Sequence, residues 1–170
     1  IKLDGKLSVG SILYEKYRVS GLNVGIKADG EKLALSGLNV KVDDSQIKGN
    51  LGISHFAKPL YTFDLDIDQV DADKYVAATP AKASATSAAD SNKPLDLSAL
   101  KALNADGTIR IGSLKFGKTK ASNININLKA DGQKLQLNPL SAKVDDSQIN
   151  ANLGISQFSN PAFNFDIKID

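Results

Sequence analysis

The chain has 170 residues, of which 42% are hydrophobic and 24% are charged, and its formal net charge at pH 7 is +2. This length and composition suffice for a hydrophobic core, but the charge provides none of the basic footprint that nucleic-acid binding requires. Because the sequence contains no cysteine, it has no disulfide framework and no thiolate metal site. No apolar run in it reaches the ~18 residues of a membrane-spanning helix.

The sequence repeats itself with an offset of 102 residues. Residues 3–68 align on 105–170 without a gap, and 33 of the 66 aligned positions are identical. The heptapeptide KVDDSQI, for example, occurs at 41–47 and again at 143–149. Self-similarity at a fixed period indicates a repeat architecture. We therefore expect two related β-repeats, the first over 1–76 and the second over 105–170.

Within each repeat, apolar residues alternate with polar ones. This period of two predicts strands that have one apolar face. Between the strands lie segments that favour tight turns, namely ADG at 28–30, DDS at 43–45 and the loop around Pro59. The pattern predicts an antiparallel meander of about five strands in each repeat.

The alternation shifts by one residue at two places in each repeat. In the first repeat the shifts fall across Gly10-Ser11 and Ser36-Gly37, and in the second across Gly112-Ser113 and Asn138-Pro139. Such a shift turns the following side chains to the wrong face unless a β-bulge absorbs it, and bulges accept glycine and proline. Since bulges bend a sheet, we expect a mainly β fold with a curved, twisted sheet, either an open groove or a half-barrel.

Two further segments separate the repeats. Residues 77–94 consist largely of alanine, serine, threonine, lysine and proline without an apolar period, which predicts a flexible loop. Within residues 95–104 a leucine recurs every three residues, at Leu97, Leu100 and Leu103, which predicts a short amphipathic helix. Asp96 or Ser98 is its expected N-cap, and Gly107 is expected to lie beyond its end.

A single short helix cannot cover the apolar faces of about ten strands. The apolar surface must close on itself as a sandwich or barrel, meet another chain, or hold an apolar ligand. Periodicity does not choose among these possibilities, because a closed core and an open trough alternate in the same way.

The residues that could carry chemistry have simpler explanations. Asp64, Asp66 and Asp68 share one side of a strand and suggest a calcium site, but Lys168 replaces Asp66 in the second repeat, which favours a solvated polar face. His55 is the only histidine and has no histidine counterpart in the second repeat. No catalytic motif is present. We therefore expect no enzyme activity, no catalytic or metal-binding residues and no cofactor.

Two long segments are separated by a loop rich in alanine and proline. They are DDSQIKGNLGISHFAKPLYTFDLDIDQVDADKY at 43–75 and PLDLSALKALNADGTIRIGSLKFGKTKASNININLKADGQKLQLNPLSAKV at 94–144. In this order, the two segments resemble the C-terminal region of the AsmA family. The resemblance covers most of the chain and rests on the order of these features. At 145–148 this chain has Asp-Asp-Ser-Gln where the family often carries a Tyr-Gly-type turn, so no role is carried over to those residues.

The resemblance implies a function in the envelope of a Gram-negative bacterium. AsmA-like proteins are held in the inner membrane by an N-terminal helix, extend into the periplasm, and are associated with outer-membrane biogenesis and lipid homeostasis. We therefore expect a periplasmic β-groove segment that shields phospholipid acyl chains and supports lipid transport, with the full-length protein tethered to the inner membrane. The alternative is a structural β-repeat scaffold that binds envelope proteins and closes its apolar face as a core.

The chain resembles a piece of a longer repeat protein. It ends on FDIKID, whereas the first repeat continues from the corresponding FDLDID into QVDADKY. On the lipid-transport hypothesis, acyl chains contact the apolar residues that alternate along the strands. These candidate lipid-facing residues are Leu22, Val24, Ile26, Leu33, Leu35, Leu51, Ile53, Phe63, Leu65, Ile67, Ile124, Ile126, Leu128, Leu135, Leu137, Leu153, Ile155, Phe165, Ile167 and Ile169.

Overall fold

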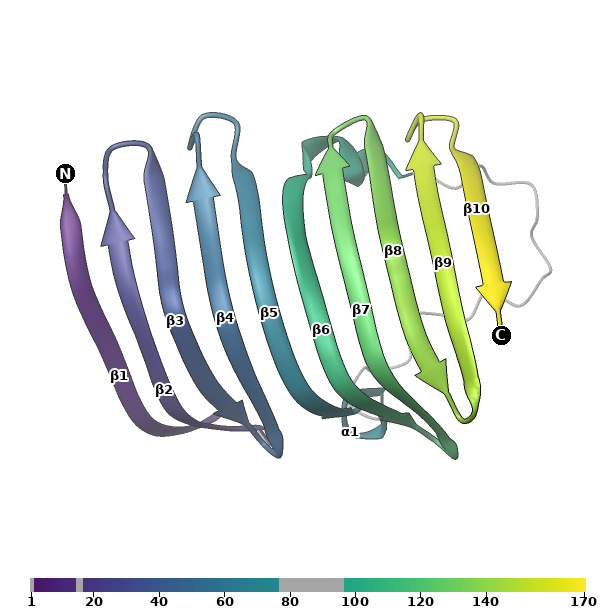
Figure 1. Ribbon diagram of the computed structural model, residues 1–170. Helices are drawn as coiled ribbons and strands as arrows, with labels where there is room; N and C mark the ends of the chain where they lie inside the picture. Colours follow the sequence, from purple (N-terminus) through teal and green to yellow (C-terminus); the bar gives the residue numbers. More distant parts are fainter. Residues whose placement is uncertain (1, 15–16, 77–96) are drawn as a thin grey trace.

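Ten strands lie side by side in one sheet, in the order in which they occur along the chain (Figure 1). The computed structural model describes residues 2–14, 17–76 and 97–170, so the predicted loop at 77–94 lies outside the described residues. The first repeat forms β1 (Leu3–Tyr14), β2 (Tyr17–Ala28), β3 (Lys32–Val42), β4 (Ser45–Ser54) and β5 (Leu60–Asp71). The second repeat forms β6 (Asn104–Phe116), β7 (Thr119–Asp131), β8 (Lys134–Val144), β9 (Ser147–Ser156) and β10 (Ala162–Ile169). The predicted fold class, an antiparallel meander in a curved open sheet, is confirmed.

The duplicated heptapeptide forms the same hairpin corner in both repeats. In the first, Val42 pairs with Ser45 across a turn in which Asp43 has a φ of 53°. In the second, Asp145 has a φ of 51° at the corresponding turn between β8 and β9. Aspartate tolerates this left-handed conformation better than most residues do. The repetition of KVDDSQI therefore reflects the reuse of one strand-turn-strand corner.

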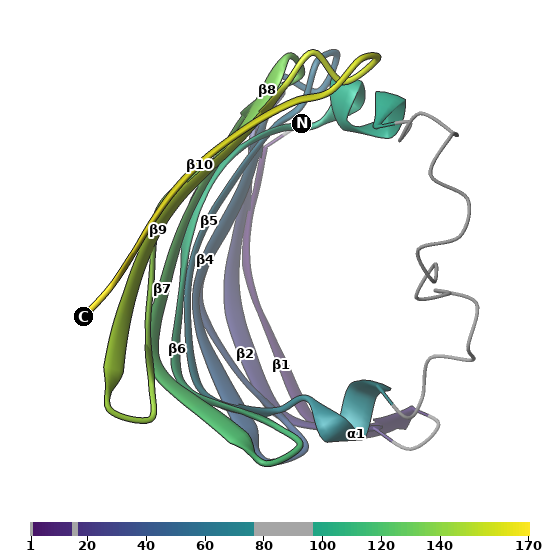
Figure 2. The ribbon, with the colours of Figure 1, turned by 90° about the vertical axis from the view of Figure 1, so that its right-hand side faces the viewer.

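The two repeats meet at β5 and β6, the one pair of neighbouring strands in the sheet that runs parallel. We call this pair the seam. Parallel neighbours need a crossover connection, and here it includes α1 (Asp73–Val76), which the sequence did not predict, and the 3₁₀ helix η1 (Ser98–Ala102). Figure 2 shows that the sheet is curved and that α1 and η1 lie at opposite ends of its concave side.

The predicted helix over 95–104 is shorter than expected and of a different type. Its described turns are closed by hydrogen bonds from Leu100 N to Leu97 O (2.9 Å) and from Leu103 N to Leu100 O (3.0 Å). A 3₁₀ helix has three residues per turn. The three-residue spacing of the leucines therefore places them on one side of η1 more directly than on an α-helix, and all three are half-buried.

The predicted N-cap of this helix is wrong. Leu97 occupies the N-cap without a side-chain capping bond, in place of Asp96 or Ser98. Gly107 lies beyond the end of the helix, as expected, and is part of β6. The β6 strand begins directly after η1 because the alternating residues from Asn104 onward pair with both β5 and β7.

Two of the predicted bulges are confirmed. The register of β3 against β4 shifts between Leu35 and Leu38, at Ser36-Gly37, where Gly37 has a φ of 60°. The register of β8 against β9 shifts between Leu137 and Leu140, at Asn138-Pro139. Both repeats therefore bend at the same place in their third and fourth strands.

The other two predicted bulges lie in neighbouring strands. β1 and β2 keep one register past Gly10-Ser11, as do β6 and β7 past Gly112-Ser113. The shifts occur between β2 and β3 around Gly21, and between β7 and β8 around Asn123, both of which have positive φ. In each of these hairpins the two strands shift their apolar pattern at opposing positions, Gly10 opposite Gly21 and Gly112 opposite Asn123. The two strands therefore stay in register with each other, and the register changes against the next strand instead.

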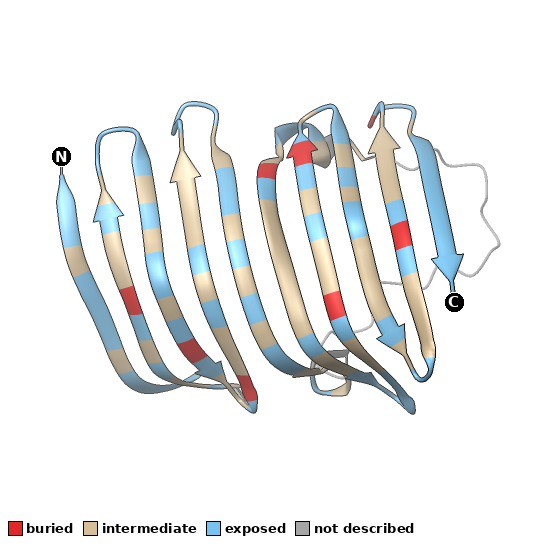
Figure 3. Ribbon diagram, viewed as in Figure 1, coloured by how far each residue is buried: buried red, intermediate tan, exposed pale blue. Residues whose placement is uncertain are grey.

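Few residues of this single sheet are fully buried (Figure 3). A sheet without a second layer buries its side chains only against neighbours on the same face. The sheet also does not close, because β1 and β10 stand at opposite ends of the strand order. The closed sandwich or barrel that periodicity left open is therefore not formed by the described residues.

Candidate functional site

Apolar side chains meet across all ten strands in continuous rows. Directly opposed residues point to the same side of a sheet, so the register identifies which side chains lie together. One row consists of Leu3, Ala28, Leu33, Ile53, Tyr61, Ala105, Ala130, Leu135, Ile155 and Phe163. The next consists of Gly5, Ile26, Leu35, Leu51, Phe63, Gly107, Leu128, Leu137, Leu153 and Phe165. We call the side of the sheet that carries these rows the apolar face.

The apolar face is the concave one. Ala105 and Ala130 oppose each other in the first row and are each 3% exposed, whereas Ala34, on the other side of the sheet, is exposed. Ala105 lies at the start of β6, directly after η1, and Ala130 lies at the end of β7, so we infer that η1 covers both alanines. A Cβ built on Gly132, at the turn after β7, would lie 2.7 Å from Lys101 O of η1, which places η1 over this corner of the concave side (Figure 2).

The register places all twenty candidate lipid-facing residues on the apolar face. Leu22 and Val24 oppose Val9 and Leu7, and the other candidates lie in the two rows above or in the ladders beside them. The same face holds further apolar residues that the predicted set omits: Leu3, Leu7, Val9, Leu38, Val40, Ile47, Ile109, Ile111, Leu140, Ile149 and Phe163. Continuing the alternation across each bulge and into the second repeat would have identified most of them.

Exposure varies across the apolar face. Val24 and Ile124 are buried, each 7% exposed, because the curved sheet crowds their neighbours against them. Leu51 and Leu153 are half-buried. On β10, Phe165 is 73% exposed. Among the described residues, only α1 and η1 lie over the concave side (Figure 2).

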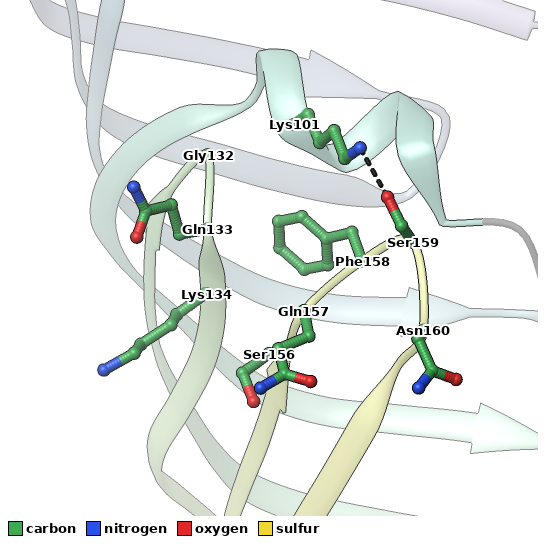
Figure 4. Close-up of a pocket in the computed structure, with 9 residues that line it drawn as sticks. All are labelled: Lys101, Gly132, Gln133, Lys134, Ser156, Gln157, Phe158, Ser159 and Asn160. Carbon is green, nitrogen blue, oxygen red and sulfur yellow. Dashed lines mark hydrogen bonds between the residues drawn. The ribbon is translucent and has the colours of Figure 1, made fainter.

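One corner of the apolar face is covered by η1. Phe158, in the loop between β9 and β10, is 2% exposed and lies beneath η1 (Figure 4). Lys101 Nζ of η1 donates a hydrogen bond of 2.5 Å to Ser159 Oγ of the same loop. An open cavity of about 710 Å³ lies beside them. The sequence did not single out Phe158, because its counterpart Phe56 has the same local pattern and is 49% exposed.

The opposite side of the sheet is polar and carries ion pairs. At the seam, Arg110 Nε donates a hydrogen bond of 2.6 Å to Asp66 Oδ1, and Arg110 also pairs with Asp64. Asp64 and Asp66, two of the three aspartates that suggested calcium, thus contact a cation, whereas Asp68 accepts a hydrogen bond of 2.7 Å from Gln46 N. The part of the chain that the structure describes holds no group of three His, Cys, Asp or Glu residues able to bind a metal ion. His55 lies exposed in the loop between β4 and β5.

Arg110 holds the pKa of Asp66 below its ordinary value, through the side-chain hydrogen bond first and the charge second. A carboxyl group whose pKa is lowered by folding stabilises the protein above its unfolded pKa of about 4, and this contribution is lost as the pH falls through the folded value. We expect Arg110→Met to raise the pKa of Asp66 in an NMR titration of the carboxyl carbon. Because the pair is exposed, the change in unfolding free energy at neutral pH should stay below about 1 kcal/mol. An unchanged pKa of Asp66 would contradict the pairing.

No family model matches the chain, and neither a curated protein nor a solved structure matches it. No helix among the described residues is long and apolar enough to span a membrane. The candidate site is therefore defined by its own geometry: an apolar, concave sheet surface over which, among the described residues, only α1 and η1 lie.

Proposed function

We propose that this chain is a periplasmic segment of an AsmA-like protein whose apolar face shields phospholipid acyl chains during lipid transport and outer-membrane biogenesis. The observation that carries the proposal is the continuity of the apolar rows across all ten strands. The full-length protein would be tethered to the inner membrane by a segment outside this sequence. The chain would act by binding lipid, without catalysis and without a cofactor.

The chemistry of the apolar face favours an acyl chain as its ligand. Aliphatic side chains predominate in the rows, and of the two rows written out above only Tyr61 contributes a side-chain hydrogen-bonding group. An extended polypeptide lying on this face would leave its N–H and C=O groups without partners, at a cost comparable to lost hydrogen bonds. A hydrocarbon chain has no such groups and loses nothing by leaving water.

The free-energy cost of exposing an acyl chain to water is large enough that lipid transport requires an apolar path. Exposing each CH₂ of an acyl chain to water costs about 0.8 kcal/mol, so an unshielded chain meets a barrier on the order of 10 kcal/mol. Strands about 4.8 Å apart give this ten-stranded sheet an apolar path of roughly 45 Å across the strands. The polar side chains on the opposite side of the sheet stay hydrated while the apolar face binds the acyl chain.

Photo-crosslinking in Gram-negative cells tests the proposal. We expect a photoreactive amino acid at Leu51 or Leu153 to form phospholipid adducts. The same group at Asn50 or Asn152 should form none, because these neighbours in sequence point to the polar side and are exposed. Adducts are identified by mass spectrometry of the purified protein.

The outcomes separate lipid binding from a protein scaffold. Lipid adducts confined to the leucine positions support the proposal. Adducts to another polypeptide at the leucine positions, without lipid, would replace it by the scaffold function. Equal lipid labelling at Asn50 and Leu51 would show that contact with lipid does not follow the apolar face, and would contradict it.

A further inference from the structure

The seam shows how one repeat docks on the next. The last strand of the first repeat, β5, pairs in parallel with the first strand of the second, β6. Within this pairing Leu65 opposes Ile109, and Ile67 opposes Ile111, which carries the apolar face from one repeat to the other. A glycine allows the close approach at one point: a Cβ built on Gly107 would lie 2.4 Å from Phe63 O and 2.5 Å from the Phe63 ring.

The two edge strands of the sheet are copies of the seam strands. At the offset of 102 residues, β10 repeats β5, and β1 repeats β6. Transferring the seam register to these strands opposes Phe163 with Leu3, Phe165 with Gly5, Ile167 with Leu7 and Ile169 with Val9. All four pairs belong to the apolar face, so the rows would continue without a break from one sheet into the next.

Gly5 and Phe165 lack here the neighbours that their counterparts have at the seam. No described atom lies within 4 Å of a Cβ built on Gly5, so a single copy of the chain gives no steric reason for a glycine at this position. Phe165 is 73% exposed, whereas its counterpart Phe63 is half-buried against β6. These two residues are the pair that the transferred register brings together.

The charges on the polar side also match. The seam opposes Asp64 with Thr108, and the transferred register opposes their counterparts, Asp166 on β10 and Lys6 on β1. An opposite-charge pair directly across two strands is favourable, whereas like charges there are repulsive. Both residues are exposed in the single copy.

We propose that β10 of one copy of this chain binds β1 of a second copy in parallel, in the register of the seam. An edge strand offers unpaired backbone groups to such a partner. Because the two edges differ, the contact is head-to-tail and produces a growing series of copies, not a closed symmetric dimer. This contact does not rest on lipid binding, and either can fail without the other.

Engineered cysteines test the register on a background that contains no native thiol. We expect Asn164→Cys on one copy to form a disulfide with Asp4→Cys on another, since their seam counterparts Thr62 and Asp106 are opposed. Parallel neighbours are about 4.8 Å apart, which a disulfide can span. The matched control pairs Asn164→Cys with Lys6→Cys, which is displaced by two residues, or roughly 6.6 Å along the strand.

A chain with both Asn164→Cys and Asp4→Cys should yield a ladder of linked oligomers under mild oxidation, and the displaced pair should yield far less. Linkage of Asn164→Cys to itself would instead indicate antiparallel pairing of two β10 strands and overturn the proposal. Equal linkage of the matched and displaced pairs, or no linkage of either, would also overturn it.

A substitution at the other strand tests the same contact without crosslinking. We expect Gly5→Val to abolish the rise of mass with concentration in sedimentation of the otherwise unchanged chain. The melting temperature of the dilute protein should not change, because a single copy leaves the space beside Gly5 open. Unchanged association of Gly5→Val, or a parent chain that stays monomeric at every concentration, would contradict the proposal.

Discussion

Phe158→Ala is expected to lower the free energy of unfolding by about 3 to 4 kcal/mol, whereas Phe56→Ala should lower it by less than about 1 kcal/mol. The two residues occupy the same position in the two repeats, yet Phe158 is 2% exposed and Phe56 is 49% exposed. Removing a buried phenylalanine loses its transfer free energy and leaves a cavity beneath η1. Removing an exposed one loses little of either.

Urea unfolding of the two variants and the parent chain measures this difference. The comparison controls for amino-acid type and for position in the repeat, and the two side chains differ in whether η1 covers them (Figure 4). Equal destabilisation by the two substitutions would mean that η1 does not pack on Phe158. In that case one corner of the apolar face would be open to solvent.

The strands could be predicted because their signal is local. Alternation over ten to thirteen residues predicts the strands β4 and β7, and it also predicts which of their residues lie on the apolar face. The bulge at Gly37 also leaves a local mark, since Leu35 and Leu38 break the alternation on either side of it. The shifts at Gly10 and Gly21 break the alternation in the same way. Which pair of strands changes register there depends on how β2 pairs with both β1 and β3, and this is not visible in the local sequence.

The parallel seam could have been deduced from the repeat. In a meander of five strands, the first and the last run in the same direction. If a second repeat is placed beside the first in the same orientation, its first strand must run parallel to the last strand of the first repeat. A count of the strands without their directions does not reveal that β5 and β6 need a crossover connection.

The burial of Phe158 beneath η1 could not have been predicted from the local sequence. Phe56 and Phe158 share their position in the repeat, and the difference between them comes from η1, which lies 56 residues or more before Phe158 in the chain. Such a contact depends on where the crossover returns to the sheet. Similarly, the pairing of Arg110 with Asp66 depends on the seam register, because Arg110 has a serine, Ser8, as its counterpart in the first repeat.

The seam itself provides the second large effect. We expect Gly107→Ala to lower the free energy of unfolding by about 2 to 3 kcal/mol, and Gly5→Ala to change it by less than about 0.5 kcal/mol in dilute solution. An added methyl group at Gly107 overlaps the backbone oxygen of Phe63, so β5 and β6 must move apart, whereas the same group at Gly5 meets no described atom.

Chemical unfolding at low protein concentration, where copies remain separate, gives both values. The ring of Phe63 could rotate away from the methyl group, but its backbone oxygen is held in the sheet, so relaxation at Gly107 requires a shift of the parallel register or of the whole strand. A shift of that kind would also displace Arg110 from Asp66, and the pKa of Asp66 would rise in the Gly107→Ala variant. If Gly107→Ala is as stable as Gly5→Ala and leaves that pKa unchanged, the two repeats are not joined by a close β5–β6 contact.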